Sequence, residues 1–257
     1  MKKKIKDIVK KKNKKKLVCL TAYSKNIAQV LDKYCDIILV GDSVANVLYG
    51  MENTHKIKLE TIIEHAKSVS KGIKSSLLVV DMPKGTYSNI KNAIRNAKYI
   101  IKKTKCDAVK LESNNNNYNV IKKLVSLNIP VMGHVGFTPQ FKKKFKVYGS
   151  NSSESKKIQN EAKKIEKAGA FSIVLECVKK STSNKITKLL KIPTIGIGSS
   201  IECDGQILVT DDILGLSGFY PRFVKKYANI KKDIEDAVSK YAKDVIKNKF
   251  PKKQNSY

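Results

Sequence analysis

The chain has 257 residues, a formal net charge of +30, and a hydrophobic fraction of 41%. This length suits one large domain with a buried core. No stretch approaches the roughly 18 uninterrupted apolar residues of a membrane span, and the N-terminal segment MKKKIKDIVKKKNKKK lacks the apolar run of a secretion signal. We therefore expect no membrane span.

The positive charge raises the possibility of nucleic-acid or membrane-surface binding. Arg95 and Arg222 are, however, the only arginines among the 52 Lys and Arg residues, although arginine is favoured for bidentate recognition of phosphates and bases. The lysines are also spread along the whole chain. We therefore interpret the charge as a solvated, compositionally biased surface. We expect small-molecule substrates, with neither nucleic acid nor membrane as a partner.

Five cysteines are scattered along the chain without a Cys-x-x-Cys pair: Cys19, Cys35, Cys106, Cys177 and Cys203. This pattern argues against a disulfide framework and against a zinc site. We therefore expect a protein of the reducing cytoplasm.

Short apolar runs alternate with amphipathic stretches along the sequence. Runs of Val, Ile and Leu without polar alternation are typical of strands buried on both faces, as in a parallel sheet wrapped by helices. The alternation predicts one (β/α)8 TIM barrel over residues 1–257, with 1–15 as a basic helical lead-in, a closing helix near 230–245 and 249–257 as a flexible tail. The predicted strands lie near 17–21, 36–40, 76–80, 107–112, 130–134, 172–176, 194–197 and 206–210.

Local signals predict the ends of several helices. Ser24 and Ser88 are suitable N-caps, and a third helix is expected from about Glu154 to Gly169, where a residue without a Cβ suits a helix C-terminus. Residues 136–153 are too polar and too rich in Gly and Ser for a core element. We expect them to form a loop or lid at the barrel mouth.

Three acids follow three of the predicted strands: Asp42, Asp81 and Glu112. The C-terminal ends of barrel strands converge on one mouth, so distant residues can meet there. Hard oxygen ligands suit Mg²⁺, which takes one or two carboxylates and leaves its other positions to water and substrate. Each acid alone could instead cap a helix or bind a lysine. A shared metal site explains the three together.

Lys110 precedes Glu112 by two residues, so on a strand both side chains point to the same face. In a barrel that face is the interior, where an unpaired ammonium is costly. Lys110 therefore either pairs structurally with an acid or also binds an anionic substrate.

Glu176 follows the apolar run SIVL and precedes Cys177 and Val178. Such surroundings disfavour its charged form and raise its pKa, which suits a general base. His134, at the end of another strand, could orient this acid, polarise a carbonyl or satisfy a hydrogen bond in the core.

Several motifs along the chain resemble, in this order, the signature blocks of the ketopantoate hydroxymethyltransferase family. The resemblance runs from about Lys16 to Phe223, and the GHVGFTPQ and DGQILV blocks are its most specific parts. The chain departs from the family pattern at Ser24, Lys84, Ser113 and in the loop over 141–150. The matching motifs are LTAYS, LVGDS, VVDMP, VKLES, MGHVGFTPQ, VLECV, IPTIGIGSS and DGQILVTDDILG.

The resemblance implies a homo-oligomeric barrel, a decamer, of the phosphoenolpyruvate mutase/isocitrate lyase superfamily. It implies transfer of a hydroxymethyl group from 5,10-methylenetetrahydrofolate to 3-methyl-2-oxobutanoate, giving 2-dehydropantoate, the first step of pantothenate synthesis. The implied cofactor is one Mg²⁺ per subunit. The implied roles are Mg²⁺ binding for Asp42 and Asp81 with Glu112 as a further ligand, oxo-acid contact for Asp42, Ser43, Asp81 and Lys110, proton acceptance for Glu176 and support for His134.

Two other functions are compatible with parts of the pattern. Another Mg²⁺-dependent barrel enzyme acting next to an oxo acid would keep Asp42 and Asp81 without requiring the GHVGFTPQ and DGQILV blocks. A lysine-rich, non-catalytic barrel that binds nucleic acid would show strong salt-dependent DNA binding and no turnover.

Overall fold

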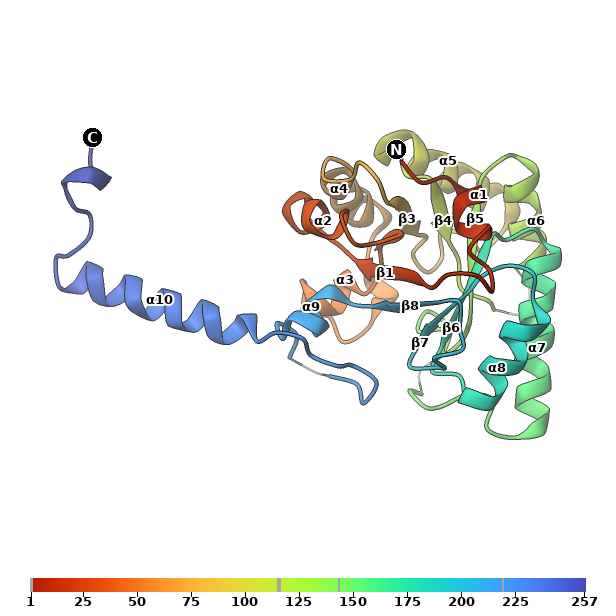
Figure 1. Cartoon of the computed structure of the whole chain (residues 1–257). Coiled ribbons are helices and arrows are strands. Elements are labelled where there is room, and N and C mark those ends of the chain that lie inside the picture. Colours follow the sequence, from red (N-terminus) through yellow and green to blue (C-terminus); the bar gives the residue numbers. More distant parts are fainter. Residues whose placement is uncertain (1, 115–116, 143, 219) are drawn as a thin grey trace. The chain divides into compact units, whose positions relative to one another are not determined.

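The computed structural model describes residues 2–114, 117–142, 144–218 and 220–257. Within these ranges, eight parallel strands form a closed barrel in sequence order, with β1 also paired to β8 (Figure 1). This confirms the predicted barrel and its strands. The ends differ slightly, because β4 stops at Lys110 and β5 continues to Gly136. The strands are β1 Leu17–Thr21, β2 Ile37–Val40, β3 Leu77–Asp81, β4 Ala108–Lys110, β5 Val131–Gly136, β6 Ser172–Glu176, β7 Thr194–Ile197 and β8 Gly205–Leu208.

Helices connect the strands, with α2 and α4 on one side of the barrel and α7 and α8 on the other (Figure 1). The predicted mouth loop over 136–153 matches the irregular segment between β5 and α7, of which residue 143 lies outside the described residues. The helices are α1 Ile5–Val9, α2 Lys25–Leu31, α3 Val44–Val47, η1 Thr54–Lys56, α4 Leu59–Ser70, α5 Ile90–Thr104, α6 Tyr118–Ser126, α7 Ser152–Lys167, α8 Lys180–Leu189, α9 Thr210–Leu214, α10 Ile230–Ile246 and η2 Lys253–Asn255.

Two predicted helix starts were wrong by one to three residues. The N-cap of α5 is Asn89, whose side chain accepts a hydrogen bond from the Asn92 amide, and not Ser88. The N-cap of α7 is Asn151, upstream of the predicted Glu154. In both cases an asparagine oxygen satisfies an otherwise unpaired amide of the first turn. Gly169 follows α7 with a φ of +95°. This left-handed conformation suits the glycine predicted at the C-terminus of the helix.

The chain divides into two compact units, Met1–Val209 with the barrel and Thr210–Tyr257 with α9, α10 and η2. None of the side chains of α10 is buried. The single domain over 1–257, the lead-in at 1–15 and the flexible tail at 249–257 stay predictions.

The barrel interior is filled by alternate residues of the strands. Leu77 and Val79 of β3 belong to this interior cluster, whereas Leu78 and Val80 belong to the cluster beneath the helices. This is the two-residue period expected of strands covered on both faces. Ile8 of α1 is fully buried in the interior cluster. The N-terminal helix therefore contributes an apolar side chain to the barrel core.

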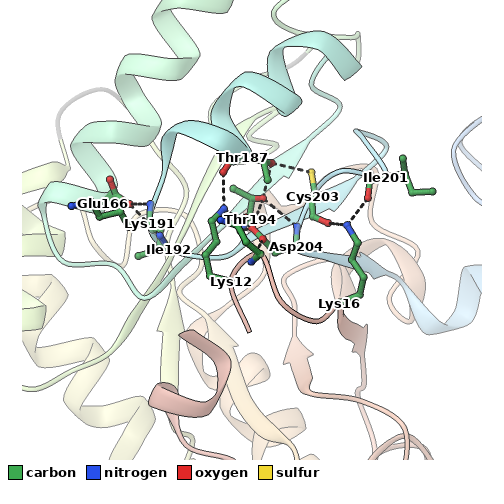
Figure 2. A network of polar contacts seen from close by, with 11 residues as sticks. Lys12, Lys16, Glu166, Thr187, Lys191, Ile192, Thr194, Ile201, Cys203 and Asp204 are labelled. Carbon is green, nitrogen blue, oxygen red and sulfur yellow. Dashed lines mark hydrogen bonds and ion pairs between the residues drawn. The ribbon is translucent and has the colours of Figure 1, made fainter. Parts of the chain in front are cut away.

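Lysines of the N-terminal segment bind the barrel directly (Figure 2). The Lys12 ammonium donates to the Thr187 carbonyl at 2.7 Å and to the Asp204 carboxylate at 2.8 Å. Lys16 donates to the carbonyl oxygens of Ile201 and Cys203 at 2.8 and 2.6 Å. These lysines have a structural role beyond compositional bias, because they hold the segment before β1 against α8 and the loop between β7 and β8.

All five cysteines are buried free thiols. Burial raises the pKa of Cys19, Cys35, Cys106, Cys177 and Cys203, which keeps these groups protonated. None of the helices in the described ranges combines the length and the apolarity needed to cross a bilayer.

Candidate active site

The interior alternation of the strands brings polar side chains to one end of the barrel. Ala108 of β4 and Val174 of β6 face the interior, so the next residue on the same face lies two positions later, at the C-terminal end of each strand. The same period applies in β3 and β5. The residues placed in this way are Asp81, Lys110, His134 and Glu176.

Lys110 and Asp81 form a buried ion pair. The Lys110 ammonium donates to Oδ1 of Asp81 at 2.7 Å, and their side chains are 6% and 3% exposed. Burial acts to lower the pKa of Lys110, but the charges of Asp81, Asp42 and Glu112 outweigh it and raise that pKa above its usual value. Lys110 is therefore a permanent cation inside the mouth.

Asp42 joins this pair through its backbone, since its amide donates to Oδ2 of Asp81 at 3.0 Å. Burial, followed by the charge of Asp81, raises the pKa of Asp42 to about 7. The surrounding protein groups therefore do not fully stabilise the negative charge of Asp42.

Gln140, in the loop after β5, binds two of these acids. Its side-chain amide donates to Oδ2 of Asp42 at 2.9 Å, and its backbone amide donates to Oε2 of Glu112 at 3.0 Å. The Tyr87 hydroxyl donates to the Gln140 side-chain oxygen at 2.6 Å. Sequence reasoning did not assign Gln140, although it ends the specific GHVGFTPQ block.

Glu112 is fully buried beside Gln140. Among the described residues its Oε1 has no hydrogen-bond partner. Burial, followed by the charge of Asp42, raises the pKa of Glu112 well above its usual value. Glu112 therefore keeps one oxygen without a hydrogen-bond partner among the described residues, in a place that disfavours its charged form.

His134 and Glu176 lie on the next two strands of the barrel, β5 and β6, which follow β4 with Lys110. Nε2 of His134 is 3.2 Å from Oε2 of Glu176, and Nδ1 is 3.7 Å from Oε1 of Glu112. Burial, followed by the charge of Lys110, lowers the pKa of His134 well below its usual value, so its ring is neutral. Burial raises the pKa of Glu176 to about 7, as its apolar surroundings predict, while its side chain keeps 16% exposure.

Ser43 follows Asp42 in the chain, and its hydroxyl contacts a tyrosine that lies outside the strands. The Tyr23 hydroxyl lies 2.8 Å from the Ser43 hydroxyl, and the Tyr23 carbonyl lies 2.8 Å from Nδ1 of His65. Tyr23 therefore links Ser43 to helix α4. Sequence reasoning missed this supporting tyrosine.

The backbone around Glu176 leaves no room for a larger residue at Gly136. Gly136 has a φ of +94°, and a Cβ built there would overlap the Glu176 carbonyl oxygen. That carbonyl accepts the Phe137 amide at 2.8 Å. Only glycine allows the end of β5 to come this close to the proposed base.

The residues of the mouth fit a divalent cation. Four carboxyl groups gather around Lys110, and burial and mutual repulsion raise the pKa of Asp42 and Glu112. A bound cation would relieve both effects. Within the described residues, no three His, Cys, Asp or Glu side chains are arranged to hold a metal. One or two carboxylates with water completing the shell would suit a hard cation such as Mg²⁺.

Solved structures with a similar fold include several enzymes. The chain aligns with phosphonopyruvate hydrolase, solved with oxalate and Mg²⁺, at a TM-score of 0.64 and 12% identity, covering 99% of this chain and 93% of the other. A 2,3-dimethylmalate lyase of the phosphoenolpyruvate mutase/isocitrate lyase superfamily aligns at 0.64 and 11% identity, covering 98% and 87%. These likenesses show that the chain shares its barrel fold with these enzymes.

Sequence comparison is more specific. The sequence model described as ketopantoate hydroxymethyltransferase matches residues 2–253. The chain therefore belongs to the ketopantoate hydroxymethyltransferase family and is an enzyme of the transferase class. Among its relatives, a 3-methyl-2-oxobutanoate hydroxymethyltransferase of Pelagibacter ubique is 55% identical over 257 residues, covering 100% of both chains.

Other relatives carry the same enzyme name. The protein of Anaplasma marginale (strain Florida) is 46% identical over 254 residues, covering 98% of this chain and 92% of the relative. That of Clostridioides difficile is 46% identical over 250 residues, covering 95% and 90%. The predicted family and enzyme class are confirmed, and the reading as a non-catalytic nucleic-acid-binding barrel is not supported.

Proposed function

We propose that this enzyme transfers a hydroxymethyl group from 5,10-methylenetetrahydrofolate to 3-methyl-2-oxobutanoate, giving 2-dehydropantoate. The observation that carries the proposal is the Glu176 carboxyl group, with a pKa of about 7, beside a neutral His134 in a mouth that also holds the Asp81–Lys110 pair. This arrangement suits removal of a proton next to an oxo group.

Glu176 is the proposed base. It accepts the C3 proton of the oxo acid, and its raised pKa makes it a stronger base than an exposed carboxylate. His134 is the proposed positioning residue, because its neutral Nε2 lies 3.2 Å from the Glu176 carboxylate. The C3 carbon then attacks the methylene carbon of the opened folate, and hydrolysis releases the product and tetrahydrofolate.

Asp42, Ser43, Asp81 and Lys110 are the proposed contacts of the oxo acid. Lys110 is the cation that offsets the carboxylate of the substrate and the charge that develops on its keto oxygen. Asp42 and Asp81 would hold one Mg²⁺, with Glu112 as a further ligand through water. When bound there, Mg²⁺ supplies Lewis-acid stabilisation of negative charge on the substrate oxygen.

The proposal extends to assembly and location. A homo-oligomer is supported by an apolar stripe on α10, where Ile234, Val238, Tyr241 and Val245 are 42–58% exposed. The expected size, a decamer, comes from the family resemblance. A reducing cytoplasm is supported by the buried free thiols. Sedimentation of the purified protein measures the assembly directly.

The test is turnover by the purified protein with 3-methyl-2-oxobutanoate, methylenetetrahydrofolate and Mg²⁺. We expect 2-dehydropantoate to form, to depend on the metal and to fall at least about 100-fold in Glu176→Ala, the scale of a lost general base. Wild-type turnover retained by the variant would refute the assigned base. Turnover that needs no divalent cation would refute the proposed metal.

A further inference from the structure

A cavity of about 500 Å³ lies between α6 and α7, outside the residues of the proposed reaction. Its lining carries three lysines, Lys156, Lys157 and Lys164, together with Tyr118 and Glu161. The three lysine residues are solvent-exposed. The cavity is thus a recess with cationic walls.

The cavity begins at the mouth end of the barrel and extends along α7 to its fourth turn. Tyr118 is the first residue of α6, and Lys156 and Lys157 lie in the second turn of α7. In a (β/α)8 barrel each helix begins on the side of the mouth, because it follows the C-terminal end of a strand. The Tyr118 hydroxyl is 3.5 Å from that of Ser113, the neighbour of Glu112. A long ligand that left the mouth between α6 and α7 would enter this cavity.

The lysine side chains in and beside the cavity outnumber its acidic side chains. Glu161 is the acidic residue of the lining, and the ammonium groups of Lys142, Lys157 and Lys164 all act on its carboxyl group. Lys164 also lies 5.3 Å from the centre of the Tyr118 ring, which holds its ammonium over the cavity wall. A ligand that brings several carboxylates would complement these charges.

We propose that this cavity binds the oligo-γ-glutamate tail of the reduced folate co-substrate, an inference that rests on the proposed function. Each γ-linked glutamate carries a free carboxylate, and the tail extends away from the pterin that reacts in the mouth. Flexible lysines suit such a chain because they act as point charges without demanding one geometry.

The test compares methylenetetrahydrofolate carrying one and five glutamates. For the wild type at low salt we expect about a tenfold lower KM with five glutamates, and we expect salt to reduce the difference. In Lys157→Gln/Lys164→Gln the preference should fall to about twofold, with kcat and the monoglutamate KM unchanged. Lys102→Gln/Lys103→Gln, two exposed lysines on α5, is the matched control and should keep the preference.

The possible outcomes separate the tail site from the reaction itself. Equal KM values for both folates, or a preference that survives in Lys157→Gln/Lys164→Gln, would overturn the tail site while leaving the proposed function intact. Tripolyphosphate and tetra-γ-glutamate can also be tested as competitors of the pentaglutamate folate. If only tripolyphosphate competes, the cavity binds a phosphate ligand and the proposal of a tail site is wrong. Absence of turnover with either folate would overturn the proposed function and the tail site together.

Discussion

The side-chain amide of Gln140 donates a 2.9 Å hydrogen bond to Oδ2 of Asp42, although the two residues are 98 positions apart in the chain. Through its backbone the same glutamine also binds Glu112. The loop after β5 therefore fixes acids at the ends of β2 and β4. This residue is a positioning residue for the proposed metal site.

Replacing Gln140 should weaken the proposed metal site. In Gln140→Ala we expect a 10–100-fold loss of Mg²⁺ affinity, the scale seen when partners of metal ligands are removed. Titration calorimetry with Mg²⁺ measures this directly. Gln159→Ala on α7, where the side-chain amide donates to Ser155, is the matched control and should bind Mg²⁺ as the wild type does. Equal Mg²⁺ affinity in both variants would argue against the positioning role.

Breaking the Asp81–Lys110 pair should destabilise the fold. Lys110→Met leaves the buried Asp81 carboxylate without its 2.7 Å partner, which typically costs about 3–5 kcal/mol. The exposed Lys67–Glu64 pair has the same 2.7 Å separation, and Lys67→Met should cost only about 0–1 kcal/mol. Denaturant unfolding measures both. The pairing account fails if the two losses are similar.

Gly136 should tolerate no side chain. Gly136→Ala places a methyl group against the Glu176 carbonyl, at a φ of +94°. We expect a loss of about 3 kcal/mol from overpacking and backbone strain. Gly85→Ala is the matched control, because its φ is +85° but nothing lies within 4 Å of the added Cβ. It should cost only about 1 kcal/mol. Similar unfolding free energies for the two variants would show that the contact with Glu176 does not matter.

The raised pKa of Glu176 predicts a pH-dependent stability cost. Folding raises this pKa from 4.5 to about 7, so the folded state binds more protons and loses stability as pH rises through that window. In metal-free protein, Glu176→Gln should be more stable than the wild type by roughly 2–3 kcal/mol at pH 8 and about equal at pH 4.5. Unfolding at both pH values tests this. A difference that does not change with pH would mean that the pKa is not raised.

Much of the fold could be predicted because its signals are local. Runs such as SLLVV and SIVL report strands buried on both faces, and their two-residue period fixes which end residue faces the mouth. Asp81, Lys110 and Glu176 could be found in this way. The asparagine caps of α5 and α7 were missed because several polar residues near each start compete for the same role.

Other features depend on contacts between distant segments and had no local signal. The N-terminal lysines looked like compositional bias, yet Lys12 reaches Asp204 across 192 positions. Gln140 lies in a polar loop, so its burial against Asp42 could not be predicted from periodicity. The specific motif around it was the available signal, and it identified the family without giving the role of the residue.

The most direct test of the central claim is exchange of the C3 proton of 3-methyl-2-oxobutanoate with D₂O, followed by NMR in the presence of Mg²⁺ and without folate. For the wild type we expect exchange that increases with pH as Glu176 ionises, with an apparent pKa near 7. In Glu176→Gln the exchange should nearly vanish. Exchange at the wild-type rate in this variant would contradict the assignment of Glu176 as the base.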